Sequence, residues 1–329
     1  MKQAKKKIAL IFAGGSLLSI RNNKTIFFVD QGSDMDKWLA EIPELGLLAD
    51  IESQYIAGES SGFTLDSIEA IVRMIAATKD TYDGYVVLIR AENVIRAGIA
   101  IEFMLQGFGK PIILTGSRFS PESIAQQDLN KIIKMGGLGL RSNVINSVQI
   151  AASTDFAATA LMYGNKLIKP TKAMKNSFYS MNLFKSVDEE YLGTIDFGIT
   201  LQRQKKVSAP AKEQYSLARN VVVVDTNGLE LFMKNIPTVK DAKKKVLLVH
   251  VNENERLPFE VVQSLKEAFQ TVIFFNEHFV LEERRVVVVE KMTWDTAVVK
   301  TLWAAAATTT PADLINVLGR EAIGEGIQP

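Results

Sequence analysis

The chain contains no cysteine, and its only histidines among 329 residues are His250 and His278. The absence of cysteine excludes disulfide frameworks and cysteine-based metal or redox sites. The two histidines do not form an HExxH-like spacing, so a metal site would need oxygen ligands alone. No cluster of such ligands stands out in the sequence. We therefore expect no metal site.

An excess of one charge and long apolar runs are also lacking. Lysine and arginine number 38 against 37 aspartates and glutamates, so the net charge of +1 leaves no basic surface that would indicate nucleic acid. No apolar run reaches the roughly 18 residues of a membrane span, and we expect no membrane contact. The length and the 47% hydrophobic content suggest two domains with ample core.

The N-terminus has the look of a signal peptide, because lysines precede the apolar stretch "IALIFAGGS" at residues 8–16. That stretch ends in Gly-Gly-Ser, however, and no good small-x-small cleavage site follows it. A buried parallel strand also reads as an unbroken apolar run, and we prefer this interpretation. The lack of a convincing export signal favours a cytoplasmic location.

Strand-like and helix-like segments alternate through the first two thirds of the chain. Buried strands are expected at 85–89 and 111–114, with a weaker one at 157–162. Helices are expected after the cap residue Thr64, at 97–106 and at 143–152. Such repetition predicts a parallel sheet covered on both faces. Ligands of these sheets bind beyond the carboxyl ends of the strands, where Ser16 and residues 90–92 would lie.

The alternation stops at 203–220, a basic and polar stretch that contains Pro210. We interpret it as an interdomain linker. The alternative is a long surface loop within one domain. The alternation then resumes, with strands expected at 221–224, 246–251, 272–275 and 286–289, a helix after Thr293, and a last helix from Thr310-Pro311 to Gly319. The sequence thus predicts an α/β protein. Its large N-terminal domain, 1–202, has a mostly parallel sheet covered by helices, and its smaller α/β domain is 221–329.

The Gly-Gly-Ser after the first strand, residues 14–16, permits several interpretations. A dinucleotide loop needs GxGxxG and a Walker loop needs GK[ST], and neither is present. Adjacent glycines let the backbone approach a ligand closely, and Ser16 then presents a hydroxyl. The ordinary role of these residues is a simple turn and cap.

The order "IALIFAGGS…PELGLLADI…GESSGFT…DGYVVLI…GKPIILTGS" over residues 8–187 resembles the L-asparaginase family, including its glutaminase relatives and the D subunit of the archaeal glutamyl-tRNA amidotransferase. A fainter match is "KMTWDTAVVKTLWAAA" near the end. The resemblance implies a two-domain α/β fold that hydrolyses the side-chain amide of asparagine or glutamine without a cofactor. It also implies a small amino-acid-like ligand and a homo-oligomer, dimer or tetramer, whose sites are completed by a neighbouring subunit.

Carried over residue by residue, the resemblance places Ser16 at the position of the family's nucleophilic threonine, next to Gly15 of the substrate pocket. Ser60 takes the position of the serine that binds the substrate carboxylate, with Ser61 beside it in the same segment. Lys175 aligns with the catalytic lysine by its spacing from "FKSV". Phe28 stands nearest to the place of a tyrosine that activates the nucleophile, and it has no hydroxyl.

The family's second motif, T-H-G-T-D-T, is the most altered. Ala91 replaces the threonine that helps position water and substrate and cannot relay a proton, although it would still line the substrate site. Glu92 keeps the carboxylate of the aspartate but moves it one methylene further. Arg90 puts a long cation where the family has glycine, and it either fills the pocket or pairs with Glu92.

These differences lead to three hypotheses. The first is a non-standard or inactive asparaginase-like homologue, a pseudoenzyme that keeps the scaffold for binding, regulation or assembly. The alternative is an active amidohydrolase that uses Ser16, Lys175 and Glu92 and releases ammonia from a small amide. The third is a structural subunit without a pocket, in which Arg90 and an extra helix at 120–135 fill the site.

Overall fold

A computed structural model describes residues 4–20, 25–119, 139–153, 155–176, 180, 182–204, 207–210, 213–225, 229–236, 239–251, 257–276, 287–289 and 291–327. The chain divides into two compact units, Met1–Tyr215 and Ser216–Pro329. The division falls inside the segment 203–220, whose role as a linker stays a prediction. The extra helix expected at 120–135 lies outside the described residues.

The first unit is built on an eight-stranded sheet in the order β12-β11-β8-β7-β6-β5-β1-β4. The strands of this unit are β1 (Lys7–Ala13), β2 (Leu18–Ile20), β3 (Thr25–Phe27), β4 (Asp50–Ala57), β5 (Gly84–Ile89), β6 (Ile112–Thr115), β7 (Thr159–Met162), β8 (Lys166–Ile168), β9 (Ala173–Lys175), β10 (Phe184–Ser186), β11 (Gly193–Ile195) and β12 (Ile199–Leu201). The five strands from β4 to β7 in this order are parallel, and β8, β11 and β12 extend the sheet in antiparallel fashion. The mostly parallel sheet expected from the sequence is confirmed.

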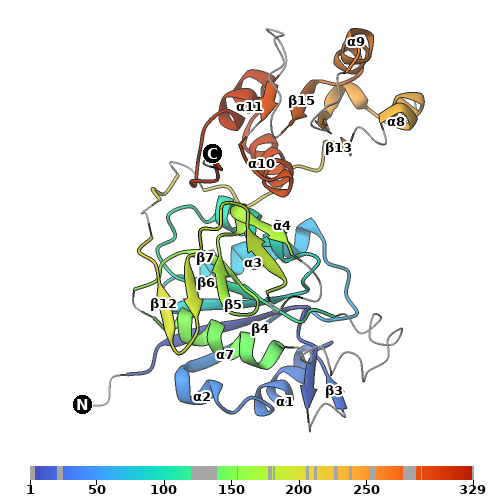
Figure 1. Ribbon diagram of the computed structural model, residues 1–329. Helices are drawn as coiled ribbons and strands as arrows, with labels where there is room; N and C mark the ends of the chain where they lie inside the picture. Colours follow the sequence, from blue (N-terminus) through green and yellow to red (C-terminus); the bar gives the residue numbers. More distant parts are fainter. Residues whose placement is uncertain are drawn as a thin grey trace. The chain divides into compact units, whose positions relative to one another are not determined.

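Helices cover both faces of this sheet (Figure 1), with α1, α2 and α7 on one face and α3 and α4 on the other. The helices of the unit are η1 (Gly32–Asp34), α1 (Met35–Ala40), α2 (Leu45–Leu48), α3 (Leu65–Ala77), α4 (Val94–Met104), α7 (Leu140–Ala151) and η2 (Pro170–Lys172). Alternate β1 residues such as Leu10 and Phe12 pack in one cluster with Trp38 of α1 and Val144 of α7. The residues 8–12 of β1 are all 0% exposed, which confirms that the N-terminal apolar run forms an interior strand.

The register of the central strands brings together the segments that follow β1, β4 and β5. Ala13, the last residue of β1, pairs with Ile89 at the end of β5 on one side and with Ala57 at the end of β4 on the other. The residues that follow these strands therefore meet at one edge of the sheet. This is the edge at which parallel α/β sheets bind ligands.

The second unit is a parallel sheet in the order β13-β14-β15-β16 with helices on both faces. Its strands are β13 (Val221–Asp225), β14 (Val246–His250), β15 (Thr271–Phe275) and β16 (Val287–Val289), and its helices are α8 (Leu229–Asn235), η5 (Ala242–Lys244), α9 (Phe259–Ala268), α10 (Trp294–Ala307) and α11 (Pro311–Leu318). The α/β class expected here is confirmed. Across the described parts of both units, none of the helices has the length and apolar character needed to cross a bilayer.

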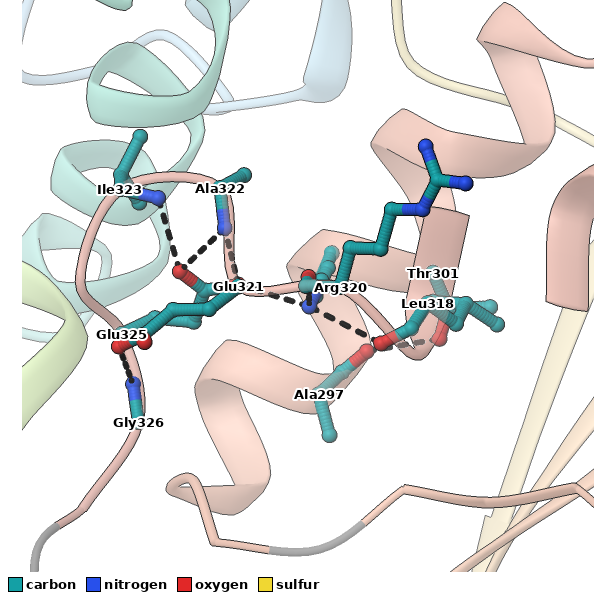
Figure 2. A network of polar contacts seen from close by, with 10 residues as sticks. Ala297, Thr301, Leu318, Arg320, Glu321, Ala322, Ile323, Glu325 and Gly326 are labelled. Carbon is teal, nitrogen blue, oxygen red and sulfur yellow. Dashed lines mark hydrogen bonds and ion pairs between the residues drawn. The ribbon is translucent and has the colours of Figure 1, made fainter. Parts of the chain in front are cut away.

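A buried ion pair fastens the segment after α11 to α10. The Lys300 ammonium lies 2.7 Å from Glu325 Oε1, and both side chains are 1% exposed. The same ammonium donates to the carbonyls of Leu318 and Arg320 at 3.0 and 2.6 Å. The Glu325 carboxylate also accepts hydrogen bonds from the N–H groups of Ala322 and Ile323, which Figure 2 shows. Lys300 thus satisfies carbonyls at the end of α11 while Glu325 supplies the counter-charge.

Candidate active site

The turn after β1 favours glycine at both of its positions and requires it at Gly15. Gly14 and Gly15 have φ angles of +86° and +66°, a region that L side chains rarely adopt. A Cβ on Gly15 would collide with the backbone carbonyl of Ile89. The Ser117 N–H also donates to Gly15 O at 2.8 Å, which ties the turn to the end of β6. This close approach places Ser16 among the residues that follow β4, β5 and β6.

The Ser16 hydroxyl is held inside the protein by two partners. It donates to Glu59 Oε1 at 2.9 Å and accepts the Val29 N–H at 2.9 Å. The Ser16 N–H also donates to Glu59 Oε1, and the Trp38 indole N–H donates to Ser16 O at 2.6 Å. Ser16 is only 1% exposed. The hydroxyl therefore has one fixed orientation, with its hydrogen directed at a carboxylate.

Glu59, which follows β4, is 0% exposed. Burial raises the pKa of its carboxyl, and the hydrogen bonds from Ser16, the charge of Arg90 and the Gly15 backbone oppose this only in part. Its second oxygen, Oε2, is buried and has no hydrogen-bond partner among the described residues. A carboxylate at 2.9 Å from a hydroxyl is within reach to take its proton. The sequence does not single out Glu59, which it shows only within the segment that contains Ser60 and Ser61.

Arg90 lies against the glycine turn. A Cβ at Gly14 would be 3.6 Å from Arg90 Cγ, so the arginine stem rests where a side chain on that turn would begin. The guanidinium donates to Ser61 O at 3.1 Å and lies 3.7 Å from Glu92 Oε1. Its side chain is 16% exposed, whereas that of Glu92 is 54% exposed. Arg90 therefore pairs with Glu92, as one of the two options predicts, and whether it fills a substrate pocket stays a prediction.

The other predicted substrate residues lie around this group. Ala91 is 8% exposed and offers no hydroxyl. Ser60 and Ser61 are exposed; the Ser60 N–H donates to Asp30 Oδ1 at 2.8 Å, and Ser61 Oγ accepts the Gly58 N–H at 3.3 Å. Glu59 accepts hydrogen bonds from Ser16 and from the Gly15 backbone. Arg90 donates to Ser61 O and pairs with Glu92. These four predicted residues therefore lie around Glu59 and Arg90.

Lys175 lies at the end of β9 and is exposed. It pairs in the β9–β10 ribbon with Phe184. In the described part of the chain, no contact connects it with Ser16 or Glu92. Its neighbour Lys172, by contrast, is buried and lies 2.8 Å from Asp188 Oδ2. Lys169 also lies 3.5 Å from Glu102 Oε1, so both of these nearby lysines are held in ion pairs.

Tyr163 is another buried polar group at this edge of the sheet. Its hydroxyl donates to Ile89 O at 2.9 Å. Burial raises its pKa well above 10, and the charges of Glu59 and Glu92 act in the same direction. Tyr163 therefore stays neutral at physiological pH and fixes the end of β5. The described residues contain no group of three or more His, Cys, Asp or Glu side chains that could hold a metal ion.

Comparisons with known proteins identify the family of the first unit. Residues 7–207 match the family model "Asparaginase, N-terminal". L-asparaginase 1 of Escherichia coli K12 is 26% identical over 213 residues, 64% of this chain and 58% of that protein. The D subunit of the glutamyl-tRNA(Gln) amidotransferase of Methanosarcina mazei is 24% identical over 199 residues, 58% of this chain and 44% of that protein. The matches thus span less than two thirds of these relatives.

Solved structures show the same fold over nearly the whole chain. L-asparaginase I from Vibrio cholerae superposes with a TM-score of 0.74 at 20% identity and covers 99% of this chain and 100% of its own. The thermostable L-asparaginase from Thermococcus kodakarensis gives a TM-score of 0.73 at 17% identity, covering 98% and 99%. At these identities the similarity shows the fold alone, and the chemistry depends on the residues at the site.

Proposed function

Because this chain belongs to the asparaginase family, we propose that it is a non-standard member that has lost the family's ordinary amide hydrolysis. It keeps the scaffold and a reduced site, and its role is binding, regulation or assembly. The proposal concerns positions 90–92 above all, where the chain departs most from the motif that it resembles.

The placement of Arg90 supports this proposal most directly. The arginine stem lies against the Gly14 turn and its guanidinium donates to Ser61 O. In this proposal it therefore stands between Ser16 and an amino-acid ligand whose carboxylate Ser60 would hold. Next to it, Ala91 has no hydroxyl to relay a proton. A positioned acid or base contributes roughly 10²- to 10⁴-fold in rate. Losses within one catalytic unit do not add, so the loss of one group can remove most of the activity of the unit.

A second candidate, an amidohydrolase with Ser16 as nucleophile, is favoured by one observation. The Ser16 hydroxyl keeps a carboxylate partner at 2.9 Å. In this candidate, Lys175 and Glu92 would supply the remaining acid–base steps, and ammonia would be released from a small amide.

The test is ammonia release from L-asparagine, L-glutamine and a panel of small amides by wild type and Ser16→Ala. We expect the two proteins to release the same background. Release by wild type that disappears in Ser16→Ala would overturn the proposed loss and establish the second candidate. Circular dichroism of both proteins confirms that the comparison is made between folded chains.

A small amino-acid-like ligand and a homo-oligomer, dimer or tetramer, belong to the same proposal. We expect L-aspartate or L-glutamate to raise the melting temperature, because a ligand that binds only the folded state stabilises it. No shift with either amino acid would instead favour the structural-subunit hypothesis.

Sedimentation velocity gives the oligomeric state, and a monomer would contradict that part of the proposal. The cytoplasmic location stays a prediction.

A further inference from the structure

The first unit has a groove of about 730 Å³ beside its first two helices. It is lined by α1, by the link from α1 to α2, by α2 and by the start of β4. Asp50 at the start of β4 pairs with Lys7 at the start of β1, so the groove lies near the amino ends of these strands. The groove is therefore separate from the candidate active site, which lies at their carboxyl ends.

We propose that this groove receives Leu47 of a second copy of the chain, in a two-fold symmetric contact in which each copy gives one leucine and accepts one. Leu47 follows Gly46, which lines the groove, so the projecting side chain and the hollow are neighbours on one surface. A two-fold contact requires such a self-complementary surface, because the same residues face each other from both copies. The inference rests on the homo-oligomer of the proposed function and names one of its interfaces.

The first argument is the exposure of Leu47. Leu45 of the same short helix is 2% exposed, and Leu48 packs against the core cluster of the sheet. Residues three apart lie on one side of a helix, so Leu47 is directed outward, and it is 77% exposed. Arg141 of α7 holds α2 by donating to both carboxylate oxygens of Glu44 at 2.7 Å. The leucine is therefore presented to solvent on a fixed support.

The second argument is the apolar floor of the groove. Ile42 and Ala49 are buried beneath it, Leu39 and Ile51 are half-buried, and Pro43 is exposed. Removal of apolar surface from water is the main driving force of protein association. A leucine side chain that enters the groove covers this floor and loses its own contact with water. One contact thus accounts for both the exposed leucine and the open hollow.

The charges on the rim suit a copy of the same surface. Asp36 and Asp50 line the groove, and Lys37 follows Asp36 in α1. All three are exposed, and none of them forms an ion pair with another described residue. Lys5, the other cation here, already donates to Gly46 O. A second copy can therefore place its Lys37 opposite a carboxylate of the first, and such pairs contribute to orientation more than to affinity.

The same surface continues along β4. Among the described strands, β4 pairs with β1 alone and ends the sheet. Ile51 lines the groove from this strand, and Tyr55 further along it is 38% exposed. Native proteins protect such edges, because the unpaired backbone groups of an edge strand invite association with another chain. A second copy seated on the groove lies beside this edge.

The first experiment measures the association of the full chain by sedimentation velocity. Leu47→Asp should raise the dissociation constant of this contact at least about 100-fold, because the two-fold symmetry removes a buried leucine from each copy. Phe197→Asp is the matched control and should assemble like wild type. Phe197 is a fully exposed apolar side chain in the turn between β11 and β12. Circular dichroism confirms that both variants fold.

The second experiment uses the absence of cysteine from the chain. Leu47→Cys and Ala40→Cys chains with different tags are co-expressed, and heteromers that carry both tags are purified. Ala40 is an exposed residue of the groove. A short bismaleimide should join these two chains to each other. It should leave the control pair, Phe197→Cys with Ala40→Cys, as separate chains.

Two results would overturn the proposal. They are a Leu47→Asp protein that assembles like wild type and a pair of chains with cysteines at 47 and 40 that the bismaleimide does not join. The first is also the result expected if a small apolar molecule were the occupant of the groove. In both cases an oligomer held by other surfaces leaves the proposed homo-oligomer standing, whereas a monomeric wild type contradicts both.

Discussion

At the scale of single residues, the geometry of the site depends on Gly15. Its positive φ and its approach to the Ile89 carbonyl leave no room for a side chain. The position of the Ser16 hydroxyl follows from this backbone path, because Ser16 is the next residue and bonds at once to Glu59 and Val29.

We expect Gly15→Ala to lower the free energy of unfolding by about 1–3 kcal/mol for the backbone strain alone, with a further loss from the collision. Urea titration measures the change. Gly46→Ala is the matched control, because no atom lies within 4 Å of a Cβ there and the residue is inside α2. Alanine should stabilise that helix by about 0.5–1 kcal/mol. Equal effects of the two substitutions would contradict the role assigned to Gly15.

Sequence reasoning predicts Ser16 at the strand end but does not find its partner Glu59. The reason is β4, whose residues "DIESQYIA" are mostly half-exposed and polar, as suits an edge strand. Without a strand at 50–57 paired to β1, the pattern of strands and helices does not bring Glu59 next to Ser16, and the family resemblance indicates Ser60 and Ser61 of the same segment instead. The catalytic role of Lys175 is implied by the family resemblance, through an alignment by spacing, and stays a prediction.

At the scale of elements, helix starts are the most readable features. Thr64 and Thr310 accept hydrogen bonds from the N–H groups of Ser67 and Asp313, as their positions before an apolar pattern indicate. The antiparallel strands β8, β11 and β12 are not predicted. They are only three residues long, so they carry too little periodicity to be distinguished from loops.

The Lys300–Glu325 pair allows a prediction for the second unit. Lys300→Met would leave a buried carboxylate without its counter-charge and two carbonyls without a donor. Breaking a buried pair in this way costs about 3–5 kcal/mol. Hydrogen exchange of the α10 amides in a urea series gives the free energy of unfolding of this unit. Lys244→Met removes an exposed pair with Asp241, whose side chains are 80% and 53% exposed, and should change it by less than about 0.5 kcal/mol.

The same pair should make the second unit sensitive to acid. Burial alone would raise the pKa of Glu325, but the charge and hydrogen bond of Lys300 and the Ile323 N–H outweigh it and lower the pKa below 4.5. The stabilisation is therefore fully present above pH 4.5 and is lost as pH falls through the folded-state pKa. The stability difference between wild type and Glu325→Gln should shrink in that acidic range, and a difference that stays constant would contradict the assignment.

At the scale of the whole molecule, the α/β class follows from the alternation of strand and helix patterns, which few other folds produce. The boundary between the units is less defined by sequence, since polar loops also occur within domains. The division between Tyr215 and Ser216 falls in a segment with several trypsin sites, Arg203, Lys205, Lys206, Lys212 and Arg219.

Limited trypsin digestion of the full chain should therefore cut first within 203–220 and leave two resistant fragments, because linkers between compact units are preferred sites of nicking. Mass spectrometry of the early fragments locates the first cut. First cuts inside either compact unit, with 203–220 intact, would favour the alternative that this segment is an ordinary surface loop of one domain.

The contact of Trp38 with Ser16 has a practical consequence. The indole N–H donates to the Ser16 carbonyl at 2.6 Å, and Trp38 is 0% exposed. The Phe12 ring packs edge-on against the indole, with the ring centroids 5.2 Å apart. Indole fluorescence responds to the hydrogen bond and polarity at this nitrogen. The protein therefore contains an optical reporter bonded to the backbone of the candidate nucleophile, and any molecule that displaces the backbone at Ser16 should change the tryptophan emission.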